Sequence, residues 1–396
     1  MKLTHIIGTY PKLSETFIKD QIISFTALDH SIQVIAGKGL HRTYDGTSDD
    51  LNVDGFKLSI SSFLTIIQCV IKFSFYFPKI YRHDKSFIQN IKDFFTIMSY
   101  LKFYDPTSNK VFIHFLTLVP LFLRFCEISN IDTPKIFTTI RGYEFNESTG
   151  LKDYEIQMVN NSGAVLLPVS ERLSKICSSY FPDLDILKVY SFRDLTKYHF
   201  APKKRSPGKV SLLIVGRLVE KKRVSELVEW LSDWKREVPI SALIVHIVGD
   251  GVERKKIIHL INSLGLRDYI KYHGALPNDE VVEYMKRADI LISNNAPSKK
   301  MDYEGIPNVI KEAMASGTFV VSSDDDGNLE ALNNGQLGLV YEIGNKQDFY
   351  KKINEYLQMP DLTRLGILEK AKCHADTEFG YDATVKKLKK IVDFKP

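Results

Sequence analysis

Short apolar runs, each followed by a longer stretch with helical periodicity, recur along the whole sequence. The runs are continuous and rich in β-branched residues, as in Leu3–Gly8, Val210–Val215 and Ala242–Val248. Strands that are buried on both faces of a parallel sheet have this composition. The intervening stretches, such as Ser225–Trp234 and Arg254–Leu264, have the spacing of amphipathic helices. The alternation therefore predicts a doubly wound α/β architecture. Further strands are expected at Ser31–Ala36, Val111–Phe115, Lys135–Ile140, Ala164–Pro168, Leu187–Tyr190, Ile270–His273, Ile290–Ser293, Thr318–Ser322 and Gly338–Tyr341, and a further helix at Asp279–Arg287.

The length of 396 residues favours two domains. Residues 200–209 contain two prolines, a glycine and a basic cluster, which is typical of a linker. We therefore expect two Rossmann-like domains, at residues 1–200 and 209–380. A cleft between two such domains is a favoured place for a small-molecule site.

Charge and cysteine content exclude several classes of protein. The chain carries 53 Lys and Arg against 48 Asp and Glu, an excess too small to indicate nucleic-acid binding. The four cysteines form no CxxC pair, which fits a reducing compartment and predicts a cytoplasmic location. We see no targeting signal after Met1 and no window of 18 apolar residues free of charge, so a membrane-spanning helix is not expected.

Residues 61–104 are unusually aromatic. They hold 12 of the 45 aromatic residues, interleaved with lysines and an arginine. One interpretation is an amphipathic helix pair that makes peripheral contact with the inner face of the cytoplasmic membrane. The alternative is that the aromatic rings are core residues and the basic residues are solvated flanks.

The sequence YEGIPNVIKEAMASG, residues 303–317, is the strongest functional signal. Pro307 fits the first position of a helix and Gly317 fits its end. Glu304 then lies in the preceding loop and Glu312 within the helix. The helix N-terminus offers unpaired N–H groups to a diphosphate, and an ionised Glu312 can accept both hydroxyl protons of a ribose. The alternative is a surface helix with capping carboxylates.

A second signal, VGRLVEKKR at residues 215–223, directly follows an expected strand. Ligands of open α/β sheets bind at the carboxyl ends of strands. The planar fork of Arg217 and the point charge of Lys222 suit two phosphates, although an exposed basic turn paired with Glu220 is the alternative. Gly249, also after a strand, allows close backbone approach to a ligand. GxGxxG and Walker patterns do not occur in the sequence.

Candidates from the first half lie after its strands. Ser14 fits an N-cap for a helix that begins near Glu15, and Ser14, Glu15 and Thr16 also follow the first strand, where they can line a cleft. His114 lies in an apolar run, where a core role and a site role are both open. Arg141 ends another strand, and we expect it to face the cleft.

Metal chemistry is not indicated. HExxH and Cys/His clusters are missing from the sequence. Asp324, Asp325 and Asp326 follow a strand, but Gly327 and Asn328 favour a polar turn there. We therefore assign no metal ligand.

At these residues the chain resembles the retaining glycosyltransferases of family 4, which have the GT-B fold of two Rossmann-like domains facing a cleft. Glu304 and Glu312 form its E-x7-E pattern, and Gly216, Arg217, Leu218 and Lys222 its G-R-L…K segment. The stretch SETFI, residues 14–18, is similar to members that build bacterial exopolysaccharide, capsule or O-antigen, and NGQLGLV, residues 334–340, to a late family segment.

The resemblance implies roles for these residues. Arg217 and Lys222 would bind the donor diphosphate and stabilise it as the leaving group, Glu312 would bind the ribose, and Glu304 would contact the donor sugar. The backbone of Gly305, Ile306, Pro307, Asn308 and Val309 would hold phosphate and sugar oxygens, with Gly249 nearby. Residues 381–396 would pack back on the first, acceptor-binding domain, and the domain at 209–380 would bind the nucleotide sugar.

Two positions depart from the family pattern. Arg141-Gly142 stands where many members have His-Gly, so a histidine role near the sugar cannot be transferred. Arg223 stands where a glycine usually follows the lysine, which leaves the conformation of the local turn open. A role for Glu330, in the family's G-x-x-E region, is also implied.

The resemblance implies a hexosyltransferase-type enzyme that moves a sugar, with retention and no obligatory metal, from a UDP- or GDP-sugar to a hydroxyl of a lipid-linked glycan acceptor in bacterial surface polysaccharide biosynthesis. The main alternative is a catalytically inactive nucleotide-sugar-binding subunit of a polysaccharide assembly complex. A dinucleotide-dependent oxidoreductase would need GxGxxG followed by an acidic residue, and neither half supplies it.

Overall fold

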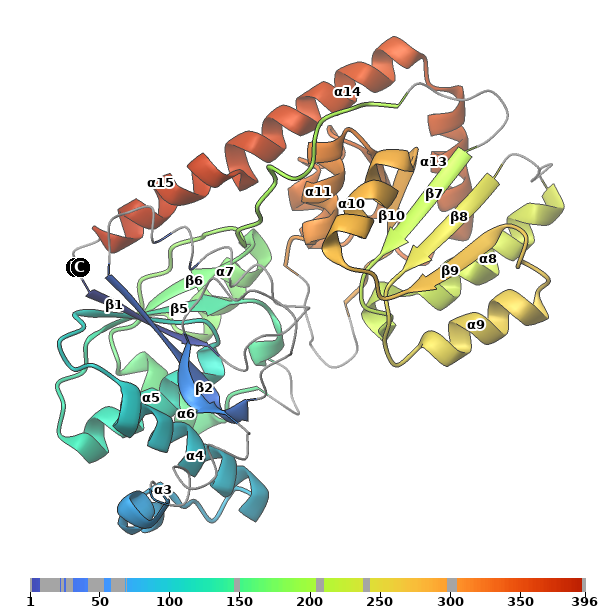
Figure 1. Ribbon diagram of the computed structural model, residues 1–396. Coiled ribbons are helices and arrows are strands. Elements are labelled where there is room, and N and C mark those ends of the chain that lie inside the picture. Colours follow the sequence, from blue (N-terminus) through green and yellow to red (C-terminus); the bar gives the residue numbers. More distant parts are fainter. Residues whose placement is uncertain are drawn as a thin grey trace. The chain divides into compact units, whose positions relative to one another are not determined.

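The computed structural model describes residues 2–7, 22, 25, 31–41, 53–57, 68, 70–145, 150–203, 210–237, 243–297 and 305–393. The chain divides into two compact units. Unit 1 comprises Met1–Phe192 and Val385–Pro396, and unit 2 comprises Arg193–Thr384. Both units are α/β, as the alternation of apolar runs predicts (Figure 1).

Unit 1 is built on a six-stranded sheet in the order β3-β2-β1-β4-β5-β6. Every strand pair is parallel, with, for example, Leu3 opposite Ile32 and Lys110. The strands are β1 (Lys2–Ile7), β2 (Ser31–His41), β3 (Val53–Lys57), β4 (Lys110–Ile113), β5 (Lys135–Ile140) and β6 (Val165–Pro168), and the described helices are α3 (Phe77–Ile80), α4 (Phe87–Phe103), α5 (Val119–Ser129), α6 (Asp153–Asn160) and α7 (Glu171–Tyr180).

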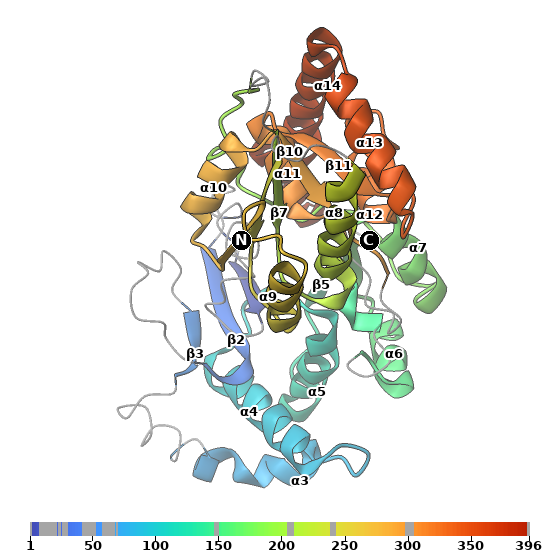
Figure 2. The same cartoon turned by 90° about the vertical axis from the view of Figure 1, so that its right-hand side faces the viewer.

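Unit 2 repeats this plan with the order β12-β11-β10-β7-β8-β9, again all parallel. Apolar side chains of α8, α9 and α13 form one core with the sheet, while α10 and α11 contact β7, β10 and β11 (Figure 2). The strands are β7 (Val210–Val215), β8 (Leu243–Val248), β9 (Ile270–Gly274), β10 (Ile290–Ser293), β11 (Phe319–Ser323) and β12 (Leu339–Tyr341), and the helices are α8 (Val224–Glu237), α9 (Arg254–Ser263), α10 (Asn278–Arg287), α11 (Asn308–Ser316), α12 (Asp326–Ala331), α13 (Lys346–Gln358) and α14 (Asp361–His374). The last helix, α15 (Tyr381–Val392), begins in unit 2 and continues into unit 1.

In each sheet, the order in which successive strands are added reverses at one point. In each, the first three strands in sequence run outward on one side, and the next three run outward on the other. The reversal lies between β1 and β4 in unit 1 and between β7 and β10 in unit 2. Ligands of open parallel sheets bind outside the carboxyl ends of the strands at such a point.

One expected strand, Leu187–Tyr190, is wrong. The segment does run beside β6, because Leu187 N–H donates to Leu166 O at 2.9 Å and Val189 N–H donates to Pro168 O at 3.0 Å. Pro168 has no N–H to return, so the regular ladder stops there, and a single bridge between Leu166 and Ile186 remains. The polar turn expected at Asp324–Asp326 is also corrected, because Asp325 is the N-cap of α12.

Helix α15 brings the end of the chain to unit 1. Leu388, Ile391 and Val392 are buried against Leu3 of β1 and Phe112 of β4, among other apolar side chains. Lys110 Nζ also donates to Val392 O. The helix therefore completes the core on this face of the first sheet.

We predict that Leu388→Ala lowers the free energy of unfolding of unit 1 by about 2–5 kcal/mol, because Leu388 is fully buried and its truncation leaves a cavity. Chemical denaturation measures the effect. Lys389→Ala, on the exposed side of the same helix, is the control. Equal stability of the two variants would contradict the packing of α15 on unit 1.

Candidate functional site

The candidate donor site lies at the carboxyl edge of the unit 2 sheet. Gly216 and Arg217 follow β7, and Asn294 and Asn295 follow β10, its neighbour across the reversal point. The segment after β7 is tied to the end of β10, since Ala296 N–H donates to Lys221 O at 3.0 Å. The cations found from sequence therefore lie where this topology places a ligand.

Glycines make this edge possible. The loops after β7 and β8 run in contact, with Gly216 N–H donating to Val248 O at 3.0 Å and Leu218 N–H to Asp250 O at 2.9 Å. A Cβ at Gly249 would lie 1.8 Å from Gly216 O, and φ of Gly249 is +144°. A side chain at position 249 would push the two loops apart. The close backbone approach expected of Gly249 is thus made to a second loop.

Arg217 and Lys222 differ in environment. Arg217 is exposed, and Lys222 is half-buried at the end of a short 3-10 turn, Glu220–Lys222. Exposure leaves the Arg217 guanidinium accessible to an anion.

The turn after Lys222 forms although Arg223 stands in the place of the family's glycine. Arg223 has φ +48°, a left-handed conformation that glycine adopts more easily. Its side chain is ion-paired with Glu226, and its carbonyl accepts from Asn294 Nδ2 at 3.2 Å. Asn294 Nδ2 also donates to Glu226 at 3.0 Å. These contacts hold the turn in place.

Helix α11 provides an N-terminus after β10. It begins at Asn308, one residue later than expected, with Pro307 as N-cap and no side-chain cap. Among the described residues, no capping side chain is therefore bonded to its first-turn N–H groups, and free N–H groups at a helix N-terminus can accept an anion. Gly305, Ile306 and Pro307 are buried, Asn308 and Val309 are partly exposed, and Gly317 ends the helix at φ +79° as predicted.

Glu312 is held in a buried polar cluster. Arg193 Nε donates to Glu312 Oε1 at 2.7 Å, and the two side chains are 9% and 6% exposed. The Arg193 guanidinium also donates to the Tyr198 hydroxyl at 3.2 Å and to Asn278 Oδ1 at 2.5 Å. Burial raises the pKa of Tyr198, and the negative charge of Glu312 adds to the effect, while the Arg193 guanidinium opposes it. Glu312 is therefore a positioned carboxylate rather than an exposed cap.

Sequence reasoning missed Arg193. It lies 119 residues before Glu312 and outside every recognised motif. The only signal available was its place next to Asp194 in a polar stretch before the linker. Removing one partner of a buried ion pair leaves the other charge uncompensated, so each of these side chains depends on the other.

A buried amide network supports the ends of β10 and β11. Asn328 Nδ2 donates to Ser323 O at 3.1 Å and Ser293 O at 3.3 Å, and Asn295 Nδ2 donates to Asn328 Oδ1 at 3.3 Å. All four residues are nearly inaccessible. Since buried polar groups are stable only when bonded, this network fixes the loop after β10.

Unit 1 carries the acceptor-side candidates His114 and Arg141. His114 directly follows β4 and Arg141 directly follows β5, so both lie at the carboxyl edge of this sheet. Arg141 Nη1 donates to Ser191 Oγ at 3.0 Å. The Glu144 carboxylate accepts from the backbone N–H of Arg141 and Gly142, and burial raises the pKa of Glu144.

His114 is paired with His5 of β1, which sequence reasoning did not single out. His5 Nδ1 and His114 Nε2 are 3.0 Å apart, and both rings are buried. Burial lowers the pKa of His5 to about 3. Burial also lowers the pKa of His114, and the neighbouring His5 and Arg141 add to this. Both imidazoles are therefore neutral near pH 7.

Four sequence candidates lie outside the described residues: Glu304, Ser14, Glu15 and Thr16. Glu330, in the described α12, is partly exposed. Among the residues that the structure describes, no group of three His, Cys, Asp or Glu side chains is arranged to hold a metal ion.

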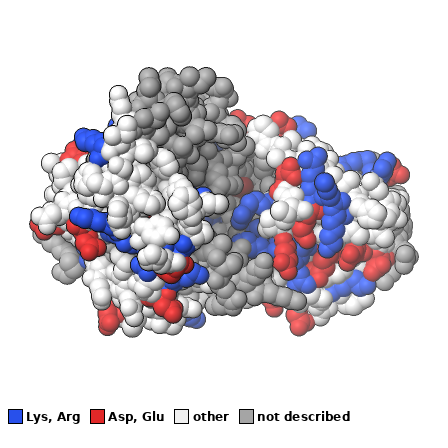
Figure 3. Space-filling view, turned by 90° about the horizontal axis from the view of Figure 1, so that it is seen from below, with Lys and Arg blue, Asp and Glu red and all other residues white. Residues whose placement is uncertain are grey.

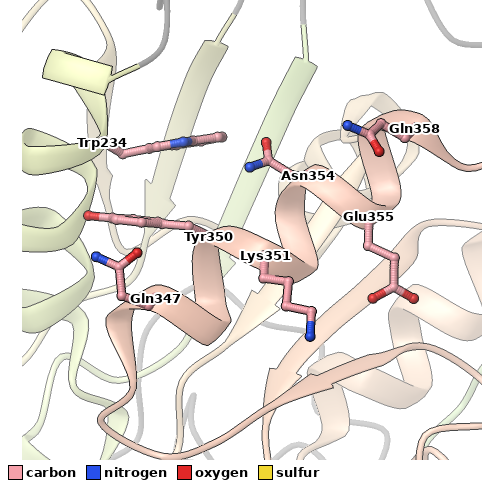
Figure 4. A pocket seen from close by; sticks show the side chains of 7 residues that line it. All are labelled: Trp234, Gln347, Tyr350, Lys351, Asn354, Glu355 and Gln358. Atoms are coloured by element: carbon pink, nitrogen blue, oxygen red, sulfur yellow. The ribbon is translucent and has the colours of Figure 1, made fainter.

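A cavity of about 600 Å³ lies elsewhere in unit 2, between α8 and α13 (Figure 4). The rings of Trp234 and Tyr350 stack there with centroids 5.9 Å apart. The remaining lining residues are Gln347, Lys351, Asn354, Glu355 and Gln358. Strand ends and site candidates do not contribute to the lining, so we do not assign this cavity to the donor site.

We predict that Gly249→Ala destabilises unit 2 by about 2 kcal/mol or more, because the new Cβ collides with a backbone oxygen at a strained φ. Thermal unfolding of the variant measures this. Gly366→Ala, in α14, is the control because a Cβ there meets open space, and we expect equal or slightly higher stability. A melting temperature of Gly249→Ala equal to that of the wild type would contradict the close loop contact.

We predict that unit 1 loses stability as pH falls below about 6.5, the ordinary pKa of histidine. In that range the unfolded chain takes up protons at His5 and His114, while the folded unit does so only near much lower pH. The free energy of unfolding should fall by up to about 1.4 kcal/mol per pH unit for each histidine.

Urea denaturation at pH 7, 6 and 5 measures this slope, with pH values chosen on either side of about 6.5. His5→Gln should reduce the slope by about one proton. His259→Gln, in the exposed part of α9, should leave it unchanged. A slope that is identical in wild type and His5→Gln would rule out a neutral buried pair.

Comparison with known proteins finds a family match for the second half of the chain. Residues 197–372 match the family described as Glycosyl transferases group 1. The match supports the expectation of a glycosyltransferase, and it covers the domain that holds Arg217, Lys222 and Glu312.

Two curated relatives act in bacterial polysaccharide synthesis by name. WcaL of Salmonella typhimurium, named for colanic acid biosynthesis, is 25% identical over 65% of this chain and 64% of WcaL. The chain thus spans less than two thirds of that relative. AmsK of Erwinia amylovora, an amylovoran biosynthesis glycosyltransferase, is 24% identical over 99% of both chains.

Solved structures share the fold. HepE from Anabaena, in complex with UDP-glucose, aligns with a TM-score of 0.66 at 13% identity, over 99% of this chain and all of HepE. A TarM mutant from S. aureus, in complex with UDP, fondaparinux and α-GlcNAc-glycerol, aligns with a TM-score of 0.70 at 14% identity over the whole of both chains. The expected GT-B fold of two doubly wound α/β domains is confirmed. None of the described helices has both the length and the apolar character needed to cross a bilayer.

Proposed function

We propose that the protein is a retaining glycosyltransferase of family 4 that transfers a sugar from a nucleotide-sugar donor to a hydroxyl of a glycan acceptor in bacterial surface polysaccharide biosynthesis. One observation carries the proposal. In a unit that matches a glycosyltransferase family, Arg217 and Lys222 follow β7 at the point where the sheet reverses, and the uncapped N-terminus of α11 follows its neighbour β10.

This arrangement suits a departing nucleoside diphosphate. When the bond between the anomeric carbon and the donor phosphate oxygen breaks, negative charge grows on the diphosphate. Arg217 and Lys222 are cations, and the α11 N-terminus offers N–H donors among residues 305–309. Groups aimed at charge that develops in the transition state accelerate the reaction. No metal ion is required for this neutralisation.

Glu312 is proposed to accept hydrogen bonds from the donor ribose, as its family position implies. The geometry adds a condition, because Arg193 already holds one carboxylate oxygen at 2.7 Å. Ribose and Arg193 must then share Glu312, with Arg193 fixing the orientation of the carboxylate. Glu304 is proposed to contact the donor sugar, and Gly249 to shape the loop beside the diphosphate.

The donor is proposed to be a UDP- or GDP-sugar. HepE and TarM were solved with UDP-glucose and UDP, which supports testing uridine nucleotides first. A bound ligand raises the melting temperature by mass action, so a thermal-shift panel of UDP-, GDP- and ADP-sugars identifies the base and the sugar.

The acceptor is proposed to be a lipid-linked glycan that is used on the cytoplasmic side of the membrane. The names of WcaL and AmsK support a surface polysaccharide. Ser14, Glu15, Thr16, His114 and Arg141 are the proposed acceptor-side residues. The buried, neutral His5–His114 pair makes His114 a support for this edge rather than a charged contact.

We predict that Arg217→Ala lowers kcat by about tenfold to 150-fold, because a charge-assisted hydrogen bond of about 1.5–3 kcal/mol to the leaving group is lost. Steady-state assays with the donor from the thermal-shift panel and extracted lipid-linked acceptor measure this. Arg267→Ala, an exposed arginine elsewhere in unit 2, is the matched control.

Two outcomes would contradict the proposal. An unchanged rate in Arg217→Ala would remove this residue from the mechanism. Donor binding with no donor consumption by the wild type, in the presence of acceptor, would instead indicate the inactive nucleotide-sugar-binding subunit.

A further inference from the structure

Residues 70–80 carry two apolar stripes, of which only one is buried. Residues 70–73 are helical, a 3-10 turn follows at Ser74–Tyr76, and α3 completes the segment. Phe73, Tyr76, Phe77 and Ile80 pack against the core of unit 1, and Phe77 meets Phe94 of α4 edge to face at 5.4 Å. The inner stripe therefore explains part of the aromatic content of this region as core.

The outer stripe has no comparable partner. Ile71 is 71% exposed and Phe75 is 62% exposed, and Pro78, the next exposed apolar residue along the segment, follows them. The first turn of α4 adds Phe87 and Ile88, which are 64% and 66% exposed. Half of the large apolar side chains that are strongly exposed among the described residues thus fall within residues 71–88. Such clustering marks an interaction surface.

The charges around the outer stripe are cationic. Residues 70–92 contain five Lys and Arg side chains and one acidic side chain, Asp84. Asp84 is ion-paired with Arg82, and Lys85 is paired with Asp93 and Glu155.

Three exposed lysines remain, at positions 72, 79 and 92, and within the described part of the chain none of them forms an ion pair. Lys72 directly follows Ile71 and Lys79 directly follows Pro78, so each is next to a residue of the outer stripe. Their ammonium groups lie 5.4 Å and 6.0 Å from the ring centroids of Phe73 and Tyr76.

The placement of the segment within unit 1 leaves this side open. In both ribbon views α3 lies beyond α4, at the end of unit 1 away from the β1–β6 sheet (Figures 1 and 2). The space-filling view from that end shows blue Lys and Arg side chains on unit 1, set among uncharged ones and some red Asp and Glu side chains (Figure 3).

We propose that this outer stripe, Ile71, Phe75 and Pro78 with Lys72 and Lys79, binds the surface of an anionic lipid bilayer. Exposed apolar side chains flanked by cations can enter the boundary between headgroups and acyl chains. The adjacent lysines then meet lipid phosphates. The inference goes beyond the proposed function, since it concerns where the enzyme sits and not what it transfers.

Co-sedimentation with vesicles tests the proposal directly. The full chain should bind vesicles that contain phosphatidylglycerol more tightly than vesicles of phosphatidylcholine alone, and added salt should weaken the binding. Lys72→Gln/Lys79→Gln should weaken it by about fivefold for each lysine. Ile71→Ser/Phe75→Ser should weaken it by about tenfold or more.

Val252→Ser/Leu362→Ser is the matched control, because these apolar residues of unit 2 are 87% and 86% exposed and lie outside the outer stripe. All variants should melt at the wild-type temperature, since the changed side chains are exposed. Absence of wild-type binding to anionic vesicles, or equal binding by the outer-stripe variants, overturns the proposal. A wild-type oligomer in light scattering that Ile71→Ser/Phe75→Ser dissociates overturns it in favour of a contact between copies of this chain.

Vesicle binding and nucleotide-sugar binding can be measured independently of each other. Nucleotide-sugar binding by thermal shift should be unchanged in the outer-stripe variants. Loss of vesicle binding with intact donor binding supports the membrane surface alone. Intact vesicle binding without any donor response would contradict the proposed function and leave the membrane surface standing.

Discussion

The close contact between the loops after β7 and β8 determines the geometry of the candidate donor site. Parallel strands deliver their carboxyl ends to one edge, but they do not by themselves bring two loop backbones into van der Waals contact. Gly216 and Gly249 do this, because a Cβ at position 249 would lie 1.8 Å from a carbonyl oxygen. Arg217 directly follows this contact, so its backbone is fixed by main-chain hydrogen bonds while its side chain remains exposed. A rigid backbone with an accessible cation suits a group that must meet a phosphate without first reorganising.

The ion pair between Arg193 and Glu312 serves a different purpose. Buried ion pairs are weak evidence for stability, since desolvation offsets much of their attraction. Glu312 of this pair lies on α11, whose N-terminus is the second element of the proposed site. Together with Tyr198 and Asn278 it locks one carboxylate orientation, which a ribose would need already in place. The pair also links Arg193, the first residue of unit 2, to helix α11.

Sequence reasoning located strands, helices and motifs because each depends on residues close together in the chain. Continuous apolar runs predicted β7, β8 and β10, and Gly317 marked the end of α11. Long-range contacts were not predictable. Arg193 meets Glu312 across 119 residues, and the His5–His114 pair requires β1 and β4 to be neighbours. The failed strand at Leu187–Tyr190 has a different cause. Its own residues favour a strand, but Pro168 in its partner lacks the N–H group that would extend the ladder.

The return of the chain through α15 has a consequence for biosynthesis. Unit 2 is one continuous stretch, Arg193–Thr384, whereas unit 1 needs residues from Val385 onward to close its core. Leu388, Ile391 and Val392 leave the ribosome only after all of unit 2 has been made. The apolar face of the first sheet near Leu3 and Phe112 therefore stays uncovered while unit 2 is synthesised and folds. A nascent chain interrupted within unit 2 would expose that face to chaperones and proteases. Only a chain that is translated through α15 can cover it.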